Sequence, residues 1–373
     1  MEIAKIAICG GHLAPALALI EKLQQIKGYR LFYIGRKKAL EGDNSLSLEF
    51  LTVRKLKVTF YPIYCGRLQR SFTLYTIPSV LKFPLSLISA ATILLKIKPQ
   101  IVISFGGYVA LPVSLVAWVM GIPIITHEQT HVLGLSNRII CRLAKITCLS
   151  WPNTENLPKN VKTVVTGNPV RESIISTPDS KRGNFNDNSL PLLYITGGSL
   201  GSRTINNVIA KIIPTLIRRF RIIHQCGSAD NQADLKILSA VRESLPAEYK
   251  KNYRVSAQVD VSDVGSIYRS ATLIISRSGA NTISEIAFVG KPAILIPLPW
   301  SASNEQEYNA RKLEEVGSAI IIRQDRLDTE KIMEAIETIM KNYSFYETRA
   351  KQATKLIVPD ATSKILRLME KYL

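Results

Sequence analysis

Two histidines and a glutamate follow apolar runs of the sequence, where an enzyme built on parallel strands holds its polar chemistry. His12 comes after the run 3–8 and a Gly-Gly turn, and His127 and Glu128 come directly after the run 123–126. A single histidine more often has a structural role, but two histidines and a glutamate at predicted strand ends are candidates for proton transfer. The sequence contains no His-x-x-His or Asp-x-Asp pair. We therefore expect a mechanism without a metal ion.

A glycine-rich turn in the second half of the chain could hold a phosphate group. The segment Gly197-Gly198-Ser199-Leu200-Gly201 follows the apolar run 192–196 and opens a predicted helix. Glycines let backbone N–H groups approach a phosphate, and a helix N-terminus adds positive potential. Ser199 would add a hydroxyl donor. The spacing is neither that of a P-loop nor a complete G-x-G-x-x-G, so a tight structural turn is an equal alternative.

A second strand–glycine–helix junction lies at Ser276–Glu285. Thr282 and Ser284 can cap the helix or bind phosphate. Glu285, which we place in the first helical turn, could accept both hydroxyl groups of a ribose. The alternative for this segment is a simple capping box.

The elements that would position these residues alternate between strand and helix along the chain. Predicted strands cover 3–8, 30–34, 101–104, 123–126, 192–196, 273–276 and 293–297, and predicted helices cover 14–26, 109–120, 201–220, 283–289 and 305–316. This alternation predicts an α/β fold whose parallel sheets are covered by helices on both faces. A strand–glycine–helix unit opens each half. We therefore expect two Rossmann-like domains that face a central cleft, with the ligand at the carboxyl ends of the strands.

The domain boundary is predicted in the polar stretch between about 151 and 190, where 181–189 is the most loop-like run of the chain. We expect an N-terminal domain of residues 1–165 and a second domain of residues 166–358. A final helix, 359–373, would pack back on the first domain.

The composition indicates a basic protein with an anionic partner. Among 373 residues, 48 are Lys or Arg and 29 are Asp or Glu, which gives a formal net charge of +19. An anionic lipid, a phosphorylated substrate or nucleic acid would suit this charge, and a merely solvated basic surface is the alternative. No nucleic-acid-binding signature occurs, so no nucleic acid is expected. The five cysteines form no C-x-x-C pair, which favours a reducing compartment, and the first residues resemble a buried strand rather than a signal peptide.

Residues 101–126 carry no charge and are long enough to cross a bilayer. Gly106-Gly107, Pro112, Gly121 and Pro123 interrupt them. These breakers favour a strand, a turn, a helix and a second strand over a membrane span.

The segment 64–98 suits contact with a membrane surface. Apolar side chains alternate there with basic ones, which are Arg67, Arg70, Lys82, Lys96 and Lys98. Such a mixture is typical of an element that lies on an anionic leaflet. The alternative is an ordinary buried helix after a loop.

Together the motifs resemble the MurG family, the bacterial N-acetylglucosaminyltransferases of peptidoglycan synthesis. The matching segments, in the family's order, are Gly10–Ala16, Phe105–Tyr108, Gly121–Pro123 with His127–Gln129, Thr166–Arg171, Gly197–Gly201, His224-Gln225, Arg277–Glu285, Pro297–Pro299 and Gln306–Ala310. They span nearly the whole chain, so the set is far more specific than any one motif. The first glycine loop is shorter than the family's Gly-Gly-x-Gly-Gly-His. Thr130 stands where asparagine is usual, and Glu305 stands where histidine is common.

The resemblance implies a GT-B fold and an inverting transfer, without a cofactor, of GlcNAc from UDP-GlcNAc to a polyprenyl-pyrophosphate-linked acceptor. That acceptor would be lipid I, undecaprenyl-pyrophosphoryl-MurNAc-pentapeptide, and the product lipid II. By matching position, the substrate-binding residues would be Gly10, Gly11, Thr130, Arg171, Ser199, Val259, Ala280, Asn281, Thr282, Ile283, Ser284, Glu285 and Gln306. Glu285 would bind the ribose, the Val259 backbone would face the uracil, and Gln306 would bind the sugar hydroxyls. The protein would be peripheral, on the cytoplasmic face of the plasma membrane.

An inverting transfer needs a general base for the acceptor hydroxyl, and His12 is the first candidate and Glu128 the second. Two other classes of function remain open. A UDP-GlcNAc 2-epimerase would share the fold but would need no lipid acceptor and hence no apolar and basic patch. A non-catalytic nucleotide-sugar-binding protein would bind the donor without turnover.

Overall fold

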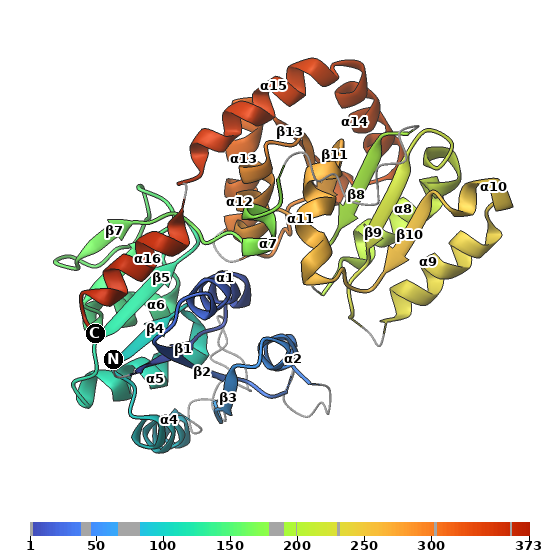
Figure 1. Ribbon diagram of the computed structural model, residues 1–373. Coiled ribbons are helices and arrows are strands. Elements are labelled where there is room, and N and C mark those ends of the chain that lie inside the picture. Colours follow the sequence, from blue (N-terminus) through green and yellow to red (C-terminus); the bar gives the residue numbers. More distant parts are fainter. Residues whose placement is uncertain are drawn as a thin grey trace. The chain divides into compact units, whose positions relative to one another are not determined.

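The chain forms two compact units, Met1–Arg171 with Val358–Leu373 and Glu172–Ile357, whose elements are labelled in Figure 1. The computed structural model describes residues 3–38, 46–65, 83–178, 190–198, 200–229, 232–301, 304–358 and 360–373. The chain passes from the first unit to the second after Arg171, a few residues beyond the boundary expected at residue 165.

The first unit is built on a parallel sheet of seven strands within the described residues, in the order β3-β2-β1-β4-β5-β6-β7. The strands are β1 (Ala4–Cys9), β2 (Tyr29–Gly35), β3 (Thr59–Pro62), β4 (Ile101–Ser104), β5 (Ile124–Glu128), β6 (Ile146–Leu149) and β7 (Thr163–Val165). The order reverses between β1 and β4, and Cys9 pairs there with Ser104. Sheets of this type bind ligands at such a switch point, beyond the carboxyl ends of the strands.

Helices cover both faces of this sheet. They are α1 (Leu13–Gln24), α2 (Leu48–Lys55), α4 (Phe83–Ile97), α5 (Gly107–Val119), α6 (Leu135–Leu143) and α16 (Ala361–Glu370). Because successive strand residues point to opposite faces, Ile6 and Ile8 pack with α1 and α16, whereas Ala7 and Cys9 pack with α4 and α5.

The final helix completes the core of the first unit. Ile365 and Met369 of α16 are fully buried against α1 and the sheet. The Tyr29 hydroxyl donates to Glu370 Oε1 at 3.0 Å. The C-terminal helix therefore packs on the N-terminal sheet, although the chain reaches it only after the second unit.

The second unit repeats the same topology. Among the residues described in this unit, the sheet has six strands in the order β10-β9-β8-β11-β12-β13, each parallel to its neighbours. They are β8 (Leu192–Thr196), β9 (Arg221–Gln225), β10 (Tyr253–Ser256), β11 (Leu273–Ser276), β12 (Ala293–Leu295) and β13 (Ala319–Ile321). The switch point lies between β8 and β11, where Thr196 pairs with Ser276.

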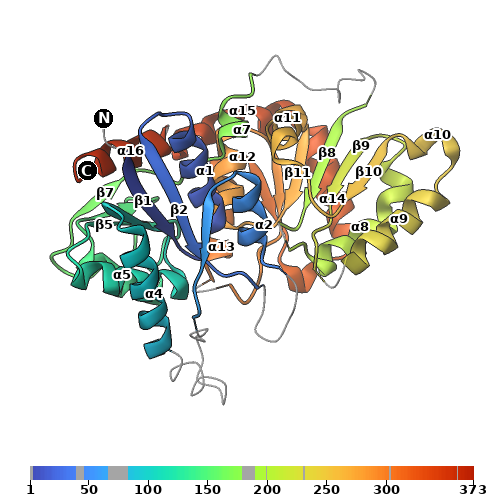
Figure 2. The same ribbon diagram turned by 60° about the horizontal axis from the view of Figure 1, so that its bottom comes forward.

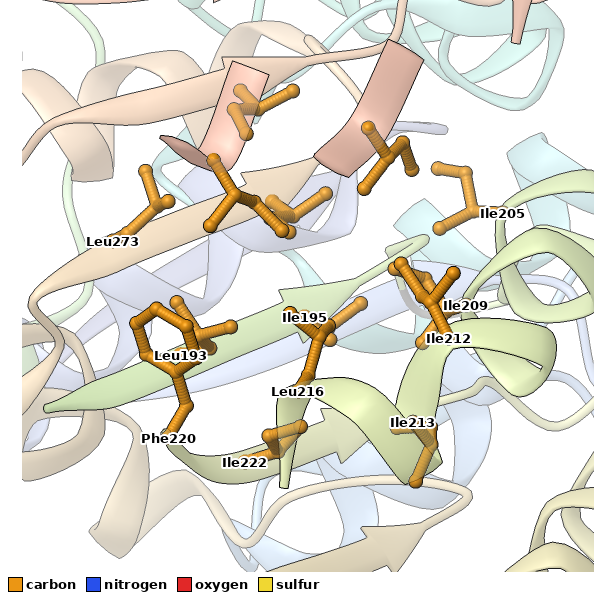
Figure 3. Packing of buried hydrophobic residues seen from close by; sticks show 14 of the residues in the cluster. Leu193, Ile195, Ile205, Ile209, Ile212, Ile213, Leu216, Phe220, Ile222 and Leu273 are labelled. Atoms are coloured by element: carbon orange, nitrogen blue, oxygen red, sulfur yellow. The ribbon is translucent and has the colours of Figure 1, made fainter. Parts of the chain in front are cut away.

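The helices of the second unit also pack on both faces of its sheet. They are α7 (Glu172–Ile175), α8 (Arg203–Leu216), α9 (Ala233–Ser244), α10 (Ala247–Lys250), α11 (Val261–Ser270), α12 (Ala280–Val289), α13 (Glu305–Val316), α14 (Thr329–Lys341) and α15 (Tyr343–Ala353), with the short 3-10 helices η3 (Gln324–Arg326) and η4 (Thr354–Leu356). Figure 3 shows Leu193 and Ile195 of β8 packed with the apolar side chains of α8. On the opposite face, Tyr194 meets Tyr268 of α11 with ring centroids 5.3 Å apart.

The uncharged segment 101–126 is divided into β4, α5 and the start of β5, which confirms the predicted strand, helix and strand. Within the described ranges, no helix is long and apolar enough to span a bilayer.

Candidate functional site

The switch point of the first unit brings two glycine turns into backbone contact. Gly10, directly after β1, has φ +144°, and a Cβ there would lie 2.8 Å from the carbonyl carbon of Phe105. Gly11 N–H donates to Gly106 O at 2.9 Å. Because only glycine fits this approach, the sequence forces the turn after β1 against the turn after β4 and fixes the position of His12.

His12 is held in one tautomer at this edge of the sheet. It is the N-cap residue of α1, and its Nδ1 lies 2.8 Å from Phe105 O. A carbonyl oxygen only accepts hydrogen bonds, so Nδ1 carries the proton and Nε2 keeps its lone pair. The half-buried imidazole can therefore take a proton through Nε2.

His127 has a different role, although it lies near His12 in the same unit. It is buried, its Nε2 donates to Gly167 O at 3.1 Å, and its ring lies 5.7 Å from that of Phe105. Burial lowers the pKa of His127 to about 4, so the ring is neutral at physiological pH. His127 joins β5 to the turn at Gly167 rather than carrying protons.

Glu128 accepts hydrogen bonds from the loop that follows β5 and from Asn137 of α6. Its Oε1 accepts from Thr130 N at 3.0 Å and Thr130 Oγ1 at 2.7 Å, and its Oε2 accepts from Gly134 N at 3.1 Å and Asn137 Nδ2 at 2.9 Å. A carboxylate has about four acceptor positions, and Glu128 is only 2% exposed. It therefore positions the loop after β5, and His12 is the better candidate for the base. The Thr130 hydroxyl, a predicted substrate contact, lies 2.7 Å from Glu128 Oε1 and 2.8 Å from Val132 O.

The switch point of the second unit opens into a pocket of about 530 Å³. Volumes of this order hold small-molecule ligands. Its lining includes the glycine turn after β8, the start of α12, and side chains from the loops after β12 and β13. Of the predicted substrate-binding residues, Thr282 and Gln306 line it. Ser199 falls outside the described residues.

The glycine turn after β8 is a tight structural turn that also lines the pocket. Gly198 has φ +86°, and a Cβ on Gly201 would lie 2.0 Å from Cys226 O, so the turn needs glycine for its own packing. Gly197, Gly198 and Gly201 also line the pocket. Ser202 then caps α8 by accepting from Ile205 N at 3.5 Å.

The start of α12 corrects two expectations. Gly279 is the N-cap and makes no side-chain cap, while Ser284 Oγ donates to Ala280 O at 2.9 Å inside the helix. The alternative of a capping box is therefore wrong. Because the helix begins at Ala280, Glu285 lies in its second turn and is buried, not in the first turn as expected. Ile283 and Ser284 are likewise buried, and Thr282 faces the pocket.

Gln306, at the start of α13, holds the loop that follows β12. Its Oε1 accepts from Leu298 N at 3.0 Å, and its carbonyl oxygen accepts from Ser278 Oγ at 2.7 Å. Within the described part of the chain the side-chain NH₂ makes no hydrogen bond, and the residue lines the pocket. The amide can therefore donate to a ligand hydroxyl.

Arg277 is a pocket residue that sequence reasoning did not single out. Its guanidinium donates to Ile296 O at 3.0 Å, Pro297 O at 3.2 Å, Ser202 Oγ at 2.7 Å and Gln324 Oε1. It thus ties together the loops after β8, β12 and β13. Burial lowers its pKa to about 10, so it stays charged at neutral pH. In the described residues its partners are all neutral oxygens, which leaves a positive charge at the pocket wall.

The remaining predicted donor-binding residues do not line the pocket. Val259 follows β10, Asn281 is half-buried in the first turn of α12, and Arg171 ends the first segment of the first unit. Across the described ranges, no group of three or more His, Cys, Asp or Glu residues is placed to hold a metal ion.

Two parallel α/β units with glycine turns at both switch points match the GT-B fold of glycosyltransferases. The glycosyltransferase family 28 N-terminal domain matches residues 9–148, and the family 28 C-terminal domain matches residues 192–365. A crystal structure of Acinetobacter baumannii MurG is similar with a TM-score of 0.71 and 27% identity, over 99% of both chains.

A Clostridium perfringens enzyme is similar along nearly the whole sequence. It is named UDP-N-acetylglucosamine–N-acetylmuramyl-(pentapeptide) pyrophosphoryl-undecaprenol N-acetylglucosamine transferase, and it is 32% identical over 355 residues, 93% of each chain. The chain therefore belongs to the MurG family of family 28 glycosyltransferases. The UDP-GlcNAc 2-epimerase of Neisseria meningitidis, with 15% identity and a TM-score of 0.62, shares the fold alone.

Proposed function

We propose that this chain transfers GlcNAc from UDP-GlcNAc to the MurNAc of undecaprenyl-pyrophosphoryl-MurNAc-pentapeptide and so converts lipid I to lipid II. The main support for this proposal is the glycine-lined pocket at the switch point of the second unit. The chain also has relatives along nearly its full length that are transferases of that name. The epimerase alternative is not favoured, because its support is the fold alone.

The pocket suits the diphosphate of the donor. Glycine turns let backbone N–H groups approach phosphate oxygens, and the N-terminus of α12 adds positive potential. The charge of Arg277, which neutral oxygens surround, adds to this potential. Thr282 lines the pocket and can donate its hydroxyl. These groups would stabilise the negative charge that gathers on departing UDP.

The rest of the donor follows the family's pattern. Glu285, one turn into α12, would bind the ribose, and the backbone at Val259 would face the uracil. Gln306 would donate its side-chain amide to a sugar hydroxyl, while its Oε1 stays bonded to Leu298 N. Arg171, Ser199, Ala280 and Asn281 are further donor contacts in this proposal.

His12 would act as the general base. The acceptor hydroxyl attacks the anomeric carbon of GlcNAc as its proton passes to His12 Nε2. The bond between the anomeric carbon and the diphosphate oxygen breaks, and UDP leaves with the electron pair. One displacement inverts the configuration at that carbon. Phe105 O keeps the proton on Nδ1, so the imidazole presents its basic nitrogen to the acceptor. Gly10 and Gly11 would lie near the acceptor pyrophosphate or the donor sugar.

We further propose that the first unit docks peripherally on an anionic leaflet, on the cytoplasmic side where the nucleotide sugar is available. Helices α4 and α5 pack against each other and cover the same face of the sheet, as Figures 1 and 2 show. Ala90, Ile93 and Leu94 of α4 are in the core, so part of the buried-helix alternative holds. The two helices still expose large apolar residues, which are Leu85, Ile88, Leu95, Trp118 and Val119.

The basic residues of the segment 64–98 would add electrostatic attraction. Arg67, Arg70 and Lys82 lie outside the described residues. Lys96 lies in the last turn of α4, and Lys98 follows the helix. Each basic residue near an anionic surface contributes about 1 kcal/mol, and physiological salt screens exposed charges beyond roughly 8 Å. Replacing Arg67, Arg70 and Lys82 with glutamate should therefore reduce co-sedimentation with anionic vesicles. Equal binding of the wild type to neutral and anionic vesicles would contradict this proposal.

An assay of products tests the catalytic proposal. The protein is incubated with UDP-GlcNAc and a short-chain, water-soluble lipid I analogue. A transferase yields the disaccharide and UDP in equal amounts. An epimerase yields UDP-ManNAc, and a pure binding protein yields neither, so either result would overturn the proposal.

A further inference from the structure

One tryptophan at the pocket is exposed although it belongs to a tightly held turn. Trp300 lies in the loop between β12 and α13, lines the pocket together with Thr282 and Gln306, and is 72% exposed. An aromatic side chain of this size removes 150–250 Å² of surface from water when it is covered. Within the described residues, Trp300 has no aromatic, cationic or hydrogen-bonding partner for its indole.

The turn that presents Trp300 is fixed at both ends. Ser301 N donates to Leu298 O at 3.1 Å, which closes a four-residue turn with Pro299 and Trp300 at its centre. Proline favours the second position of such a turn. Gln306 clamps the turn twice, because its Oε1 accepts from Leu298 N at 3.0 Å and its backbone N–H donates to Ser301 Oγ at 3.2 Å. The turn that carries the exposed indole is thus anchored to Gln306.

The polar groups of the pocket wall indicate which part of a nucleotide sugar would cover the indole of Trp300. The glycine turn, Arg277 and the N-terminus of α12 attract a diphosphate. In a nucleotide sugar, the nucleoside and the sugar leave the diphosphate in opposite directions. A hexopyranose ring has hydroxyl groups around its edge and C–H groups on its faces. The side-chain amide of Gln306 can donate to a hydroxyl group on the ring edge. The indole of Trp300, in the same pocket wall, can cover the C–H face.

We propose that Trp300 is a specificity-determining residue that packs its indole against the C–H face of the transferred amino sugar while Gln306 binds a hydroxyl on the ring edge. This inference rests on the proposed donor site in the second unit. It separates two parts of donor binding: the glycine turns hold the UDP part, and the clamped turn recognises the sugar.

Calorimetry with two probes, UDP-GlcNAc and UDP, tests this separation. Trp300→Ala should weaken UDP-GlcNAc binding by about tenfold, which corresponds to roughly 1.4 kcal/mol. The affinity for UDP should stay within about twofold. Trp300→Phe keeps a flat ring and should retain most of the sugar-dependent affinity. Phe345→Ala, which removes another exposed aromatic of the same unit, is the matched control and should change neither affinity.

Three outcomes would overturn the inference. Unchanged UDP-GlcNAc affinity in Trp300→Ala would show that the indole does not contact the sugar. Equal losses for UDP and UDP-GlcNAc would assign Trp300 to the nucleotide or to the fold of the loop. Failure of the wild-type protein to bind UDP would instead contradict the donor site itself, and the inference with it. Retained UDP binding in the variant also reports that the pocket is folded.

Discussion

Arg277→Met removes a positive charge and four hydrogen bonds from the pocket of the second unit. The effect on ligand affinity and the effect on stability can be measured separately. The guanidinium donates to oxygens of three loops, through Ser202, Ile296 with Pro297, and Gln324. Methionine has a similar length but donates no hydrogen bond. Arg277→Lys keeps the positive charge and loses the planar fork that reaches several acceptors at once.

The stability loss follows from the lost hydrogen bonds. At about 1 kcal/mol net for each bond, four bonds give about 4 kcal/mol, and the apolar packing of methionine offsets about 1 kcal/mol of this. A net loss of about 3 kcal/mol lowers the melting temperature of a unit of this size by about 6–12 °C. Arg219→Met is the control, because Arg219 is exposed and paired with Glu337. An exposed pair contributes only about 0–1 kcal/mol.

The affinity loss follows from the charge. At an effective dielectric constant of about 20, unit charges roughly 6–8 Å apart interact by about 2–3 kcal/mol. Solvent and mobile ions at the open pocket reduce this value. We therefore expect Arg277→Met to weaken UDP binding by about tenfold and Arg277→Lys to weaken it by less than about threefold.

Differential scanning calorimetry and titration with UDP measure the two effects on the same samples. If Arg277→Met binds UDP like the wild type, the charge at the pocket wall does not serve a diphosphate. If Arg277→Lys loses as much affinity as Arg277→Met, the geometry of the loops, and not the charge, controls binding.

Four further predictions concern the general base, the ribose contact, the membrane-docking surface and the pH dependence of stability. His12→Ala should reduce turnover by about 10²–10⁴-fold with donor affinity unchanged, and full turnover in that variant would remove His12 as the base. Glu285→Ala should weaken UDP-GlcNAc binding by about 1–3 kcal/mol in calorimetry, whereas unchanged affinity would exclude it from the ribose site. Ile88→Asp, at a side chain 63% exposed, should lower vesicle co-sedimentation without changing urea unfolding, and undiminished vesicle binding would place the docking surface elsewhere. Burial lowers the pKa of His127 to about 4 and that of His224 to about 3. Below their ordinary value of 6.5 the unfolded chain binds more protons, so stability should fall as pH drops from 6.5 toward 4, and a flat profile in urea unfolding would contradict this.

The parts of the fold that the sequence predicts are those with continuous apolar runs. Strands β4, β8 and β11 are buried at every residue, because helices cover both faces, and their sequences show this directly. The strands without a prediction include the edge strands β7 and β10, which are short and partly exposed. Arg254 in β10 faces solvent, so no apolar run marks that strand.

The site is predictable where it depends on local backbone geometry. Gly10 and Gly201 mark turns whose close approaches exclude any side chain, and His12 follows from the first of these turns. Arg277 could not be assigned, because its partners Ser202, Ile296 and Gln324 lie 75, 19 and 47 residues away along the chain. The role of Glu128 depends on the turn at 130–134, which folds the donors onto the carboxylate, and a list of residue types does not show this.

The configuration of the product tests the central claim most directly. UDP-GlcNAc carries its sugar as the α-anomer, and a single displacement must give the β-linked disaccharide. Nuclear magnetic resonance of a reaction with a water-soluble lipid I analogue reports the anomeric proton coupling of the new bond and the release of UDP. We predict a β-linked GlcNAc–MurNAc product that forms in step with UDP and disappears in His12→Ala. An α-linked product, or UDP-ManNAc formed without the disaccharide, would contradict the assignment of this chain as an inverting N-acetylglucosaminyltransferase.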